Sequence, residues 1–441
     1  MMLKQILFII SLIITLGIFT YSVLRLISFF KLTKKGFPIR NFGKRFMLMI
    51  KVAIGQTKMF RRPIIGFIHA LVFWGFCIIL IGSIEMVIDG IFGTERVLKS
   101  LGIVYDVIIA SGDIFALIIA LAILIFLFRR IFLHIKRFSG MEMTHKTHID
   151  ANIALTLILL LMISLLGMNT FYYQHAVATN HEIYGVFPVS KIIAGWFSEL
   201  SASQLYVLHE VNWWIHILLI FFFANYLPYS KHFHVFLSVP NVFLSRLAPL
   251  GKLDNMESIT KEVKLMMDPD AAFQEPTEGE AEQTERFGVK DIEDVLWKTY
   301  FDSLACTQCG RCTAVCPANI TGKKLSPRKI IMDVRSRMNE IGPKKVKDPN
   351  YDDGKALLRD YITEEELWAC TTCNACAQEC PMNINHPTLI VEMRRYLVME
   401  EAAAPGELNT IFNNIENNGA PWQFSQEDRM LWAEDLYINE N

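Results

Sequence analysis

The chain has 441 residues, 52% of them hydrophobic and 20% charged, and its mean hydropathy is +0.31. This composition is too apolar for an ordinary soluble protein of that length, and it argues against intrinsic disorder and a disulfide-stapled secreted scaffold. The formal net charge of −1 provides no overall attraction for nucleic acid, so no nucleic-acid partner is expected. Nearly all of the apolar excess precedes about residue 230, which predicts a membrane half followed by a soluble half.

Five apolar stretches are long enough to cross a bilayer, whose hydrocarbon core of about 30 Å requires about 20 helical residues. The first stretch is too long for the apolar region of a secretory signal and ends without a small-residue cleavage site, so we interpret it as a span. Residues 1–236 are therefore predicted to form a membrane domain of five helices. The spans run approximately over Ile6–Phe30, Ile64–Ile88, Ile103–Phe128, Ala151–Phe171 and Val211–Tyr229.

Basic residues in the loops predict the orientation of these helices, because cytoplasmic loops carry an excess of Lys and Arg. The segment Lys31–Arg62 holds ten basic residues and no acid, and Arg129–Asp150 holds five more. The loops Asp89–Gly102 and Tyr172–Glu210 together hold three. We therefore expect a multi-pass protein, embedded in the lipid of a bacterial or archaeal cytoplasmic membrane. Its N-terminus would lie outside, and everything after Tyr229 would lie in the cytoplasm.

The soluble half divides into a connecting segment and a domain. Residues 237–285 are expected to form a membrane-proximal segment and an acidic linker of low order, since Asp268–Glu285 contains no basic residue. Residues 286–441 show helical periodicity and no sustained alternation of apolar and polar residues, which predicts an α-helical cytoplasmic domain.

The strongest chemical signal is the motif Cys-x2-Cys-x2-Cys-x3-Cys-Pro, which occurs twice in this domain. Three closely spaced thiolates can converge on three irons of a [4Fe–4S] cluster, and the fourth, followed by proline, typically reaches the other cluster. Two zinc sites are the alternative, but zinc ligands usually come as two separated pairs. Two neighbouring clusters suit one-electron transfer and form no substrate pocket. This interpretation assigns one cluster to Cys306, Cys309, Cys312 and Cys380, and the other to Cys370, Cys373, Cys376 and Cys316.

Histidines in the membrane half are the second signal, because a histidine there is costly unless it has a partner. His69 lies near the cytoplasmic end of the second span, His216 lies within the fifth, and His234 follows it. Neutral imidazoles from two helices could ligate the iron of a b-type haem from both sides. The expected topology puts His69 and His234 on one membrane side and pairs them. His216 lies 18 residues before His234, which is about 27 Å along a helix. A hydrogen bond to a lipid headgroup or a backbone carbonyl is the alternative for His216.

The membrane half resembles the haem b-containing gamma subunit of respiratory nitrate reductase. The two share five spans, a histidine near the start of the second, and the pattern H…P-x-S-K-x-x-H, which begins here at His216 and ends at His234. The resemblance implies a haem b held by His69 and His234. It also implies a distal haem held by His216 and a histidine ten residues after His69, a position that is Ile79 in this chain.

Two interpretations of the distal site therefore stay open. Either His216 has another partner, such as His175 or His181 from the outer loop, or the chain binds a single haem.

The soluble half resembles the iron–sulfur subunit of heterodisulfide reductase over Ala305–Pro327 and Trp368–Ile390. In fused relatives the chain continues past a segment like Pro421–Leu436 into a CCG domain that carries the catalytic site. No CCG motif occurs here, so the resemblance implies a separate CCG-domain catalytic partner. The relatives include disulfide reductases and oxidases of reduced flavoproteins, which makes an electron-transfer flavoprotein a further candidate partner.

Together these patterns predict an all-α protein: a cytochrome b-like bundle of five transmembrane helices, followed by an α-helical ferredoxin-type domain with two [4Fe–4S] clusters. The favoured function is a membrane electron-transfer subunit, not catalytic alone, that links quinone to the cytoplasmic partner. Asp113 in the third span is the candidate proton carrier at a quinone site, with an interfacial cap as its alternative role. A redox-sensing or assembly scaffold is the alternative function. An ion-translocating subunit has less support, because isolated carboxylates do not form a pathway.

Overall fold

The computed structural model describes residues 2–268 and 286–437, so the expected acidic linker lies almost wholly outside the described residues. Within those two ranges the regular structure is helical, and extended backbone pairs only at isolated bridges. This confirms the predicted all-α character.

Among the described residues, five helices are long and apolar enough to cross a membrane, one for each expected span, and they support a multi-pass membrane protein. A helix suits this environment because it satisfies its own backbone hydrogen bonds where no water is available. Most of the helices continue beyond the apolar stretch into polar flanking residues. They are α1 (Met2–Phe30), α3 (Pro63–Phe92), α4 (Ile103–Ile131), α5 (His145–Thr179) and α7 (Ala202–Tyr226).

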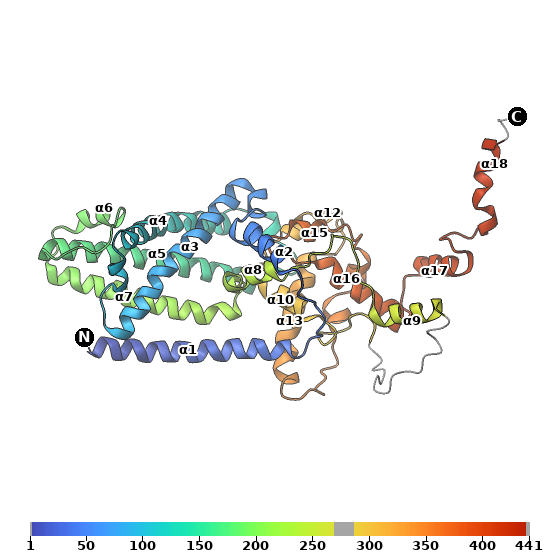
Figure 1. Ribbon diagram of the computed structural model, residues 1–441, viewed down its shortest axis with the longest axis horizontal. Helices are drawn as coiled ribbons and strands as arrows, with labels where there is room; N and C mark the ends of the chain where they lie inside the picture. Colours follow the sequence, from blue (N-terminus) through green and yellow to red (C-terminus); the bar gives the residue numbers. More distant parts are fainter. Residues whose placement is uncertain (1, 269–285, 438–441) are drawn as a thin grey trace.

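Helix α5 packs against both α4 and α7, and α3 packs against α4. Small residues allow this close approach, as is common between membrane helices. Ala116 of α4 and Ala154 of α5 are fully buried, and a side chain at Gly75 of α3 would overlap the ring of Phe115. Helix α1 runs along the edge of the bundle, where it contacts α3 and α7 (Figure 1).

The soluble half consists of short helices around the two cysteine loops. Its longest helix, α13, starts with a proline and is capped by Ser326, whose hydroxyl accepts a hydrogen bond from the Lys329 backbone amide. Tyr300, Ile330 and Leu389 belong to the core that these helices share. The helices are α10 (Trp297–Ala305), α11 (Arg311–Ala314), α12 (Pro317–Ile320), α13 (Pro327–Lys345), α14 (Glu364–Trp368), α15 (Ala375–Glu379) and α16 (His386–Arg395).

The two halves are joined by an extensive interface. Phe29 at the end of α1 and Phe233 lie in the same core as the soluble domain. Asn241 donates hydrogen bonds to the Asp302 carboxylate at 3.0 Å and to the Met382 carbonyl at 2.8 Å. The segment expected beside the membrane therefore starts inside a helix, α8 (His234–Phe243), that is packed between the halves. The remaining helices are α2 (Phe42–Met49), α6 (Ser190–Ala194), α8 (His234–Phe243), α9 (Glu257–Met267), α17 (Gly406–Asn418) and α18 (Leu431–Tyr437).

The loops before α3 and before α5 also meet the soluble domain. Arg61 forms an ion pair with Glu379 at 3.1 Å, and Glu142 pairs with Arg328 at 2.7 Å. Both basic loops that were predicted to share one side of the membrane therefore contact the cysteine domain. Helices α17 and α18 extend away from the rest of the molecule (Figure 1).

Candidate redox sites

Four cysteines from both motifs border one small cavity, and we call them the junction thiol set: Cys306, Cys309, Cys312 and Cys380. Cys306 and Cys309 lie in the turn between α10 and α11, Cys312 lies in α11, and Cys380 directly follows α15. Gly310 allows this turn, because its φ is +71° and a Cβ there would overlap the carbonyl oxygen of Arg137. Burial and the neighbouring thiols of Cys309 and Cys380 raise the pKa of the Cys312 thiol well above its usual value.

The other four cysteines form the remote thiol set: Cys370, Cys373, Cys376 and Cys316. Their loop repeats the geometry of the first, because Thr372 and Asn374 take positive φ values of 53° and 60° where Gln308 and Gly310 have 55° and 71°. Burial and then the Cys370 thiol raise the pKa of Cys376 to about 12, and Cys316 and Cys373 contribute in the same direction. Cys373 is exposed.

The fold thus places Cys380 beside the first motif and Cys316 beside the second. Among the described residues, no three His, Cys, Asp or Glu side chains lie close enough together to hold a single metal ion.

A cavity of about 480 Å³, the junction cavity, lies between the membrane helices and the junction thiol set. His69, His232 and His234 border it, together with Phe73, Phe76 and other apolar side chains of the bundle. The Nδ1 atom of His234 donates a hydrogen bond to the Lys231 carbonyl at 3.2 Å, so in the neutral ring Nε2 is the unprotonated nitrogen. The Nδ1 atom of His69 is buried and has no hydrogen-bond partner in the described part of the chain.

The junction cavity is also strongly cationic. Within the described residues its lining contains no Asp or Glu. The Nε and Nη2 atoms of Arg130 are buried and have no hydrogen-bond partner there. Buried guanidinium groups require an anionic or polar partner, so this lining suits an apolar group that carries carboxylates. The basic side chains are Lys58, Arg129, Arg130, Arg137, Lys231 and Arg311.

A haem has these properties: a flat apolar ring, an iron that accepts two imidazoles, and two carboxylates. The residues of the junction cavity fit that group. Sequence reasoning singled out His69 and His234 but missed the cationic lining, whose local signal is the Arg129–Arg130 pair in the last turn of α4. His232, which is not among the predicted ligands, borders the cavity as well.

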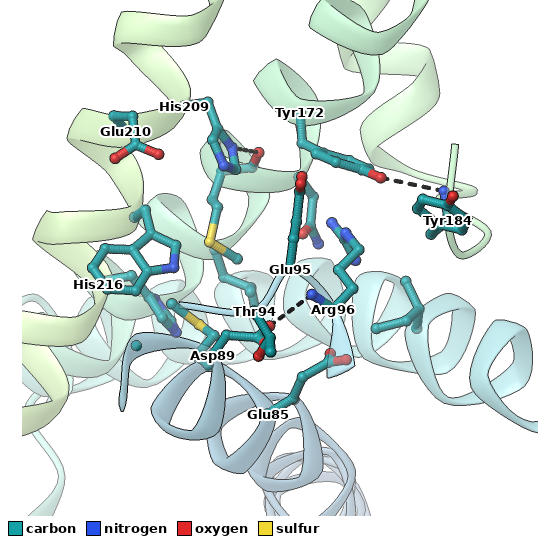
Figure 2. Close-up of a pocket in the computed structure, with 18 of the residues that line it drawn as sticks. Glu85, Asp89, Thr94, Glu95, Arg96, Tyr172, Tyr184, His209, Glu210 and His216 are labelled. Atoms are coloured by element: carbon teal, nitrogen blue, oxygen red, sulfur yellow. Dashed lines mark hydrogen bonds between the residues drawn. The ribbon is translucent and has the colours of Figure 1, made fainter. Parts of the chain in front are cut away.

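A second cavity of about 1050 Å³, the distal cavity, lies toward the other end of the bundle. Figure 2 shows side chains that line it, among them His209, His216 and Tyr172. His209 and His216 of α7 border it, and both rings are fixed by α5. The Nδ1 atom of His209 donates to the Met168 carbonyl at 3.1 Å, and that of His216 to the Leu161 carbonyl at 3.0 Å. Arg96 lies over the ring of Tyr172, with its guanidinium carbon 3.9 Å from the centroid.

His216 and Ile79 border both cavities. His175 and His181, the partners considered for His216, border the distal cavity. The structure thus gathers the histidines that the sequence connected with a second haem around one space. His209 joins them there.

The carboxylate of Asp113 is 1% exposed and borders the distal cavity. It accepts hydrogen bonds from the backbone amides of Val189 and Ser190 at 2.8 and 2.9 Å, from Asn169 at 3.2 Å and from the Ser190 hydroxyl. These bonds hold the start of α6 against α4. In this structure, Asp113 therefore has an anchoring role.

Comparison with known proteins identifies the soluble half. A family model described as a 4Fe-4S dicluster domain matches residues 305–384, which contain all eight motif cysteines. The chain contains a 4Fe–4S dicluster domain. No solved structure gives a significant match.

Several relatives share more of the chain. A probable iron-sulfur-binding oxidoreductase, FadF of Bacillus subtilis, is 28% identical over 95% of this chain and 59% of its own length. An EtfAB:quinone oxidoreductase of Syntrophomonas wolfei is 26% identical over 88% of this chain and 54% of its own length. The chain spans a little over half the length of these two proteins. A CoB-CoM heterodisulfide reductase subunit of Methanosarcina acetivorans is 36% identical over 24% of this chain and 52% of its own length.

These likenesses confirm the coarser prediction. The chain is homologous to the iron–sulfur subunit of heterodisulfide reductase and to FadF-like iron–sulfur oxidoreductases, and electron transfer by iron–sulfur clusters is supported.

Proposed function

We propose that this chain carries electrons between a membrane quinone and a cytoplasmic catalytic partner, and that it is not a catalyst by itself. The shared lining of the junction cavity is the observation that carries the proposal. His69 borders the cavity from the bundle and His234 from the start of α8, and Gln308 and Cys309 border it from the cysteine domain. When bound, a b-type haem and two [4Fe–4S] clusters would supply one-electron chemistry at adjoining positions.

In this proposal His69 and His234 are the haem ligands. The hydrogen bond from His234 Nδ1 to the Lys231 carbonyl would fix the tautomer and the ring orientation, as such supporting bonds commonly do for ligating histidines. Arg130 would hold a haem carboxylate, because its buried guanidinium lacks a hydrogen-bond partner among the described residues. The junction and remote thiol sets would each hold one cluster.

The distal cavity is the proposed quinone site. Here the described structure offers an apolar approach from the bundle and several titratable side chains. Asp113 borders it, but the proton-carrier role predicted for Asp113 would require one of its four hydrogen bonds to open. A second haem would use His216, with a partner among His175, His181 and His209.

The domain organisation and the partners belong to the same proposal. Residues 1–236 form the membrane domain and residues 286–441 the cluster domain, with the N-terminus outside and the cluster domain in the cytoplasm. The names of the relatives, an EtfAB:quinone oxidoreductase and heterodisulfide reductase subunits, support quinone, an electron-transfer flavoprotein and a CCG-domain protein as the partner classes.

Absorbance spectroscopy of the purified full chain tests the proposal. The wild type should show reduced b-type haem bands, and His69→Ala should lose them while it keeps its iron and acid-labile sulfide. His145→Ala is the matched control, because His145 is exposed at the start of α5. A wild type without haem, or an unchanged spectrum in His69→Ala, would overturn the haem assignment. Clusters that exchange electrons with neither quinone nor quinol in membranes would favour the sensing scaffold.

A further inference from the structure

The two thiol sets stand in very different electrostatic surroundings. Near the junction set, Lys58 donates from Nζ to the carbonyl of Cys380 itself at 3.0 Å. Arg311 is 3% exposed, and its Nη1 donates to the Lys58 carbonyl at 2.9 Å. The positive charge of Arg311 interacts with the thiols of Cys309 and Cys380. Two cations from different halves of the protein therefore meet beside this set.

Three further cations approach the same set from other directions. Lys231 donates from Nζ to the Gln308 side chain at 3.3 Å, within the loop that carries the first thiols. Arg335 donates to the carbonyls of Pro228 and Ser230 and interacts electrostatically with Cys306. Arg328 borders the thiol cavity directly.

Carboxylates compensate these charges only in part. Arg328 is paired with Glu142 at 2.7 Å, and Lys231 lies 3.9 Å from Asp150. Glu379 interacts electrostatically with both Lys58 and Arg311, but it already forms an ion pair with Arg61 at 3.1 Å.

The side chains of Lys58, Arg311 and Arg335 donate hydrogen bonds to backbone carbonyl groups. A carbonyl satisfies the donor but leaves the net charge of the side chain in place. These three cations therefore keep much of their charge beside the junction set.

The remote set has a simpler environment. Arg394 is the cation beside it, and it donates to the carbonyls of Leu367 and Cys370. Cys373 and the neighbouring Thr371 and Thr372 are exposed, so water screens the charge of Arg394 at this loop.

An added electron makes a cluster more negative, so its reduction potential depends on net charge, hydrogen bonds and exposure around it. Exposure of Cys373 to water raises the reduction potential at the remote set. The cations raise the potential at the junction set, so the two effects act in opposite directions on the difference between the two potentials. The cations should dominate, because fixed charges act more strongly in a buried, low-dielectric site than in water. At the remote set, only one of the four thiols is exposed.

We propose that Lys58, Arg311 and Arg335 hold the reduction potential at the junction set above that at the remote set. This inference rests on the two-cluster assignment above. One electron then passes from the cluster on the remote set, which is oxidised, to the cluster on the junction set, which is reduced, and no bond or proton changes. Electrons delivered at the exposed Cys373 loop therefore settle beside the membrane, so the favoured direction is from the cytoplasmic partner toward quinone.

Redox titration of the purified full chain with dithionite, followed by electron paramagnetic resonance, tests this order. Cys373→Ser identifies the signal of the remote cluster. We expect the junction cluster to be reduced first, with an equilibrium constant of about tenfold or more between the two sites, which is about 59 mV for one electron.

Charge substitutions give the second arm of the experiment. Lys58→Met and Arg311→Met should each lower the junction potential and leave the remote potential unchanged, whereas Arg394→Met should lower only the remote one. Lys58→Arg should retain the wild-type value, which separates charge from packing. Lys324→Met is the control, because Lys324 is exposed and paired with the exposed Glu365.

The outcomes separate the inference from the proposed function. The inference would be overturned if the remote cluster were reduced before the junction cluster. It would also be overturned if the junction potential did not change in Lys58→Met and Arg311→Met. If wild-type protein showed neither cluster signal and contained no acid-labile sulfide, the proposed function would be overturned instead. Iron content measured on each variant shows whether a missing signal reflects a lost cluster, and Lys58→Gln then replaces Lys58→Met.

Discussion

The ion pair between Glu142 and Arg328 should be the most sensitive polar contact between the two halves. Glu142 lies in the loop before α5, and its carboxylate accepts hydrogen bonds from Arg328 Nε at 2.7 Å and from the Ser326 hydroxyl at 2.6 Å. The side chains of Glu142 and Arg328 are 5% and 1% exposed. Glu142→Ala therefore leaves a buried guanidinium without its counter-charge.

Breaking a buried pair in this way costs about 3–5 kcal/mol, because the remaining charge stays desolvated. For a domain of this size, each kcal/mol of lost unfolding free energy lowers the thermal midpoint by about 2–4 °C. The cluster domain should therefore unfold at a temperature about 6–20 °C lower. Thermal unfolding in detergent, followed by loss of cluster absorbance, measures the shift.

Two controls make this result interpretable. Lys324→Met removes an ion pair whose side chains are both 60% exposed, and such a pair contributes about 0–1 kcal/mol. The double variant Glu142→Met/Arg328→Met removes both buried charges, so it should be more stable than Glu142→Ala. A midpoint for Glu142→Ala equal to that of Lys324→Met would refute the reasoning.

The same pair predicts a dependence on pH. Burial by itself would raise the pKa of Glu142, but the Arg328 guanidinium and the Ser326 hydroxyl outweigh it and lower the pKa below the usual value. A carboxyl with a lowered folded-state pKa contributes stability above its unfolded pKa and loses it as pH falls through the folded pKa. The thermal unfolding midpoint of the wild type should therefore fall as the pH drops below the ordinary pKa range of glutamate. The midpoint of Glu142→Gln should fall less over the same pH interval. Equal losses in the two proteins would contradict this assignment.

Three further substitutions test the sites. Cys316→Ser should remove the remote cluster signal and leave the junction signal intact, although Cys316 belongs to the first motif. Loss of the junction signal instead would contradict the assignment of Cys316 to the remote set. Arg130→Met should weaken haem retention by about 10–100-fold in a haem-transfer assay, as for other outer-shell partners, and full retention would argue against its carboxylate role. Gly310→Ala should lower cluster content per chain, because φ is +71° and the Arg137 carbonyl occupies the Cβ position; Gly322→Ala, at φ +85° with open space, is the control for strain alone.

Local patterns in the sequence determined much of this protein. Five apolar stretches predict five spans, because a helix satisfies its own backbone hydrogen bonds in lipid, and the described structure has these five helices. The repeated cysteine spacing predicts a dicluster domain, because cluster ligation demands thiolates at short, regular intervals, and the family match confirms it. His69 and His234 stay predicted haem ligands that now border one cavity.

Tertiary structure alone decided the surroundings of these groups. Lys58, Arg130 and Arg311 are far apart in sequence, and each looks locally like an ordinary basic residue, yet folding brings them to one cavity. In the sequence, Asp113 looks like an isolated acid within the membrane, but the start of α6 folds back and donates backbone hydrogen bonds to its carboxylate. The physical reason is the same in both cases. Charge and hydrogen-bond partners act through space over a few ångströms, and residue spacing along a chain does not reveal which distant segments will lie within that range.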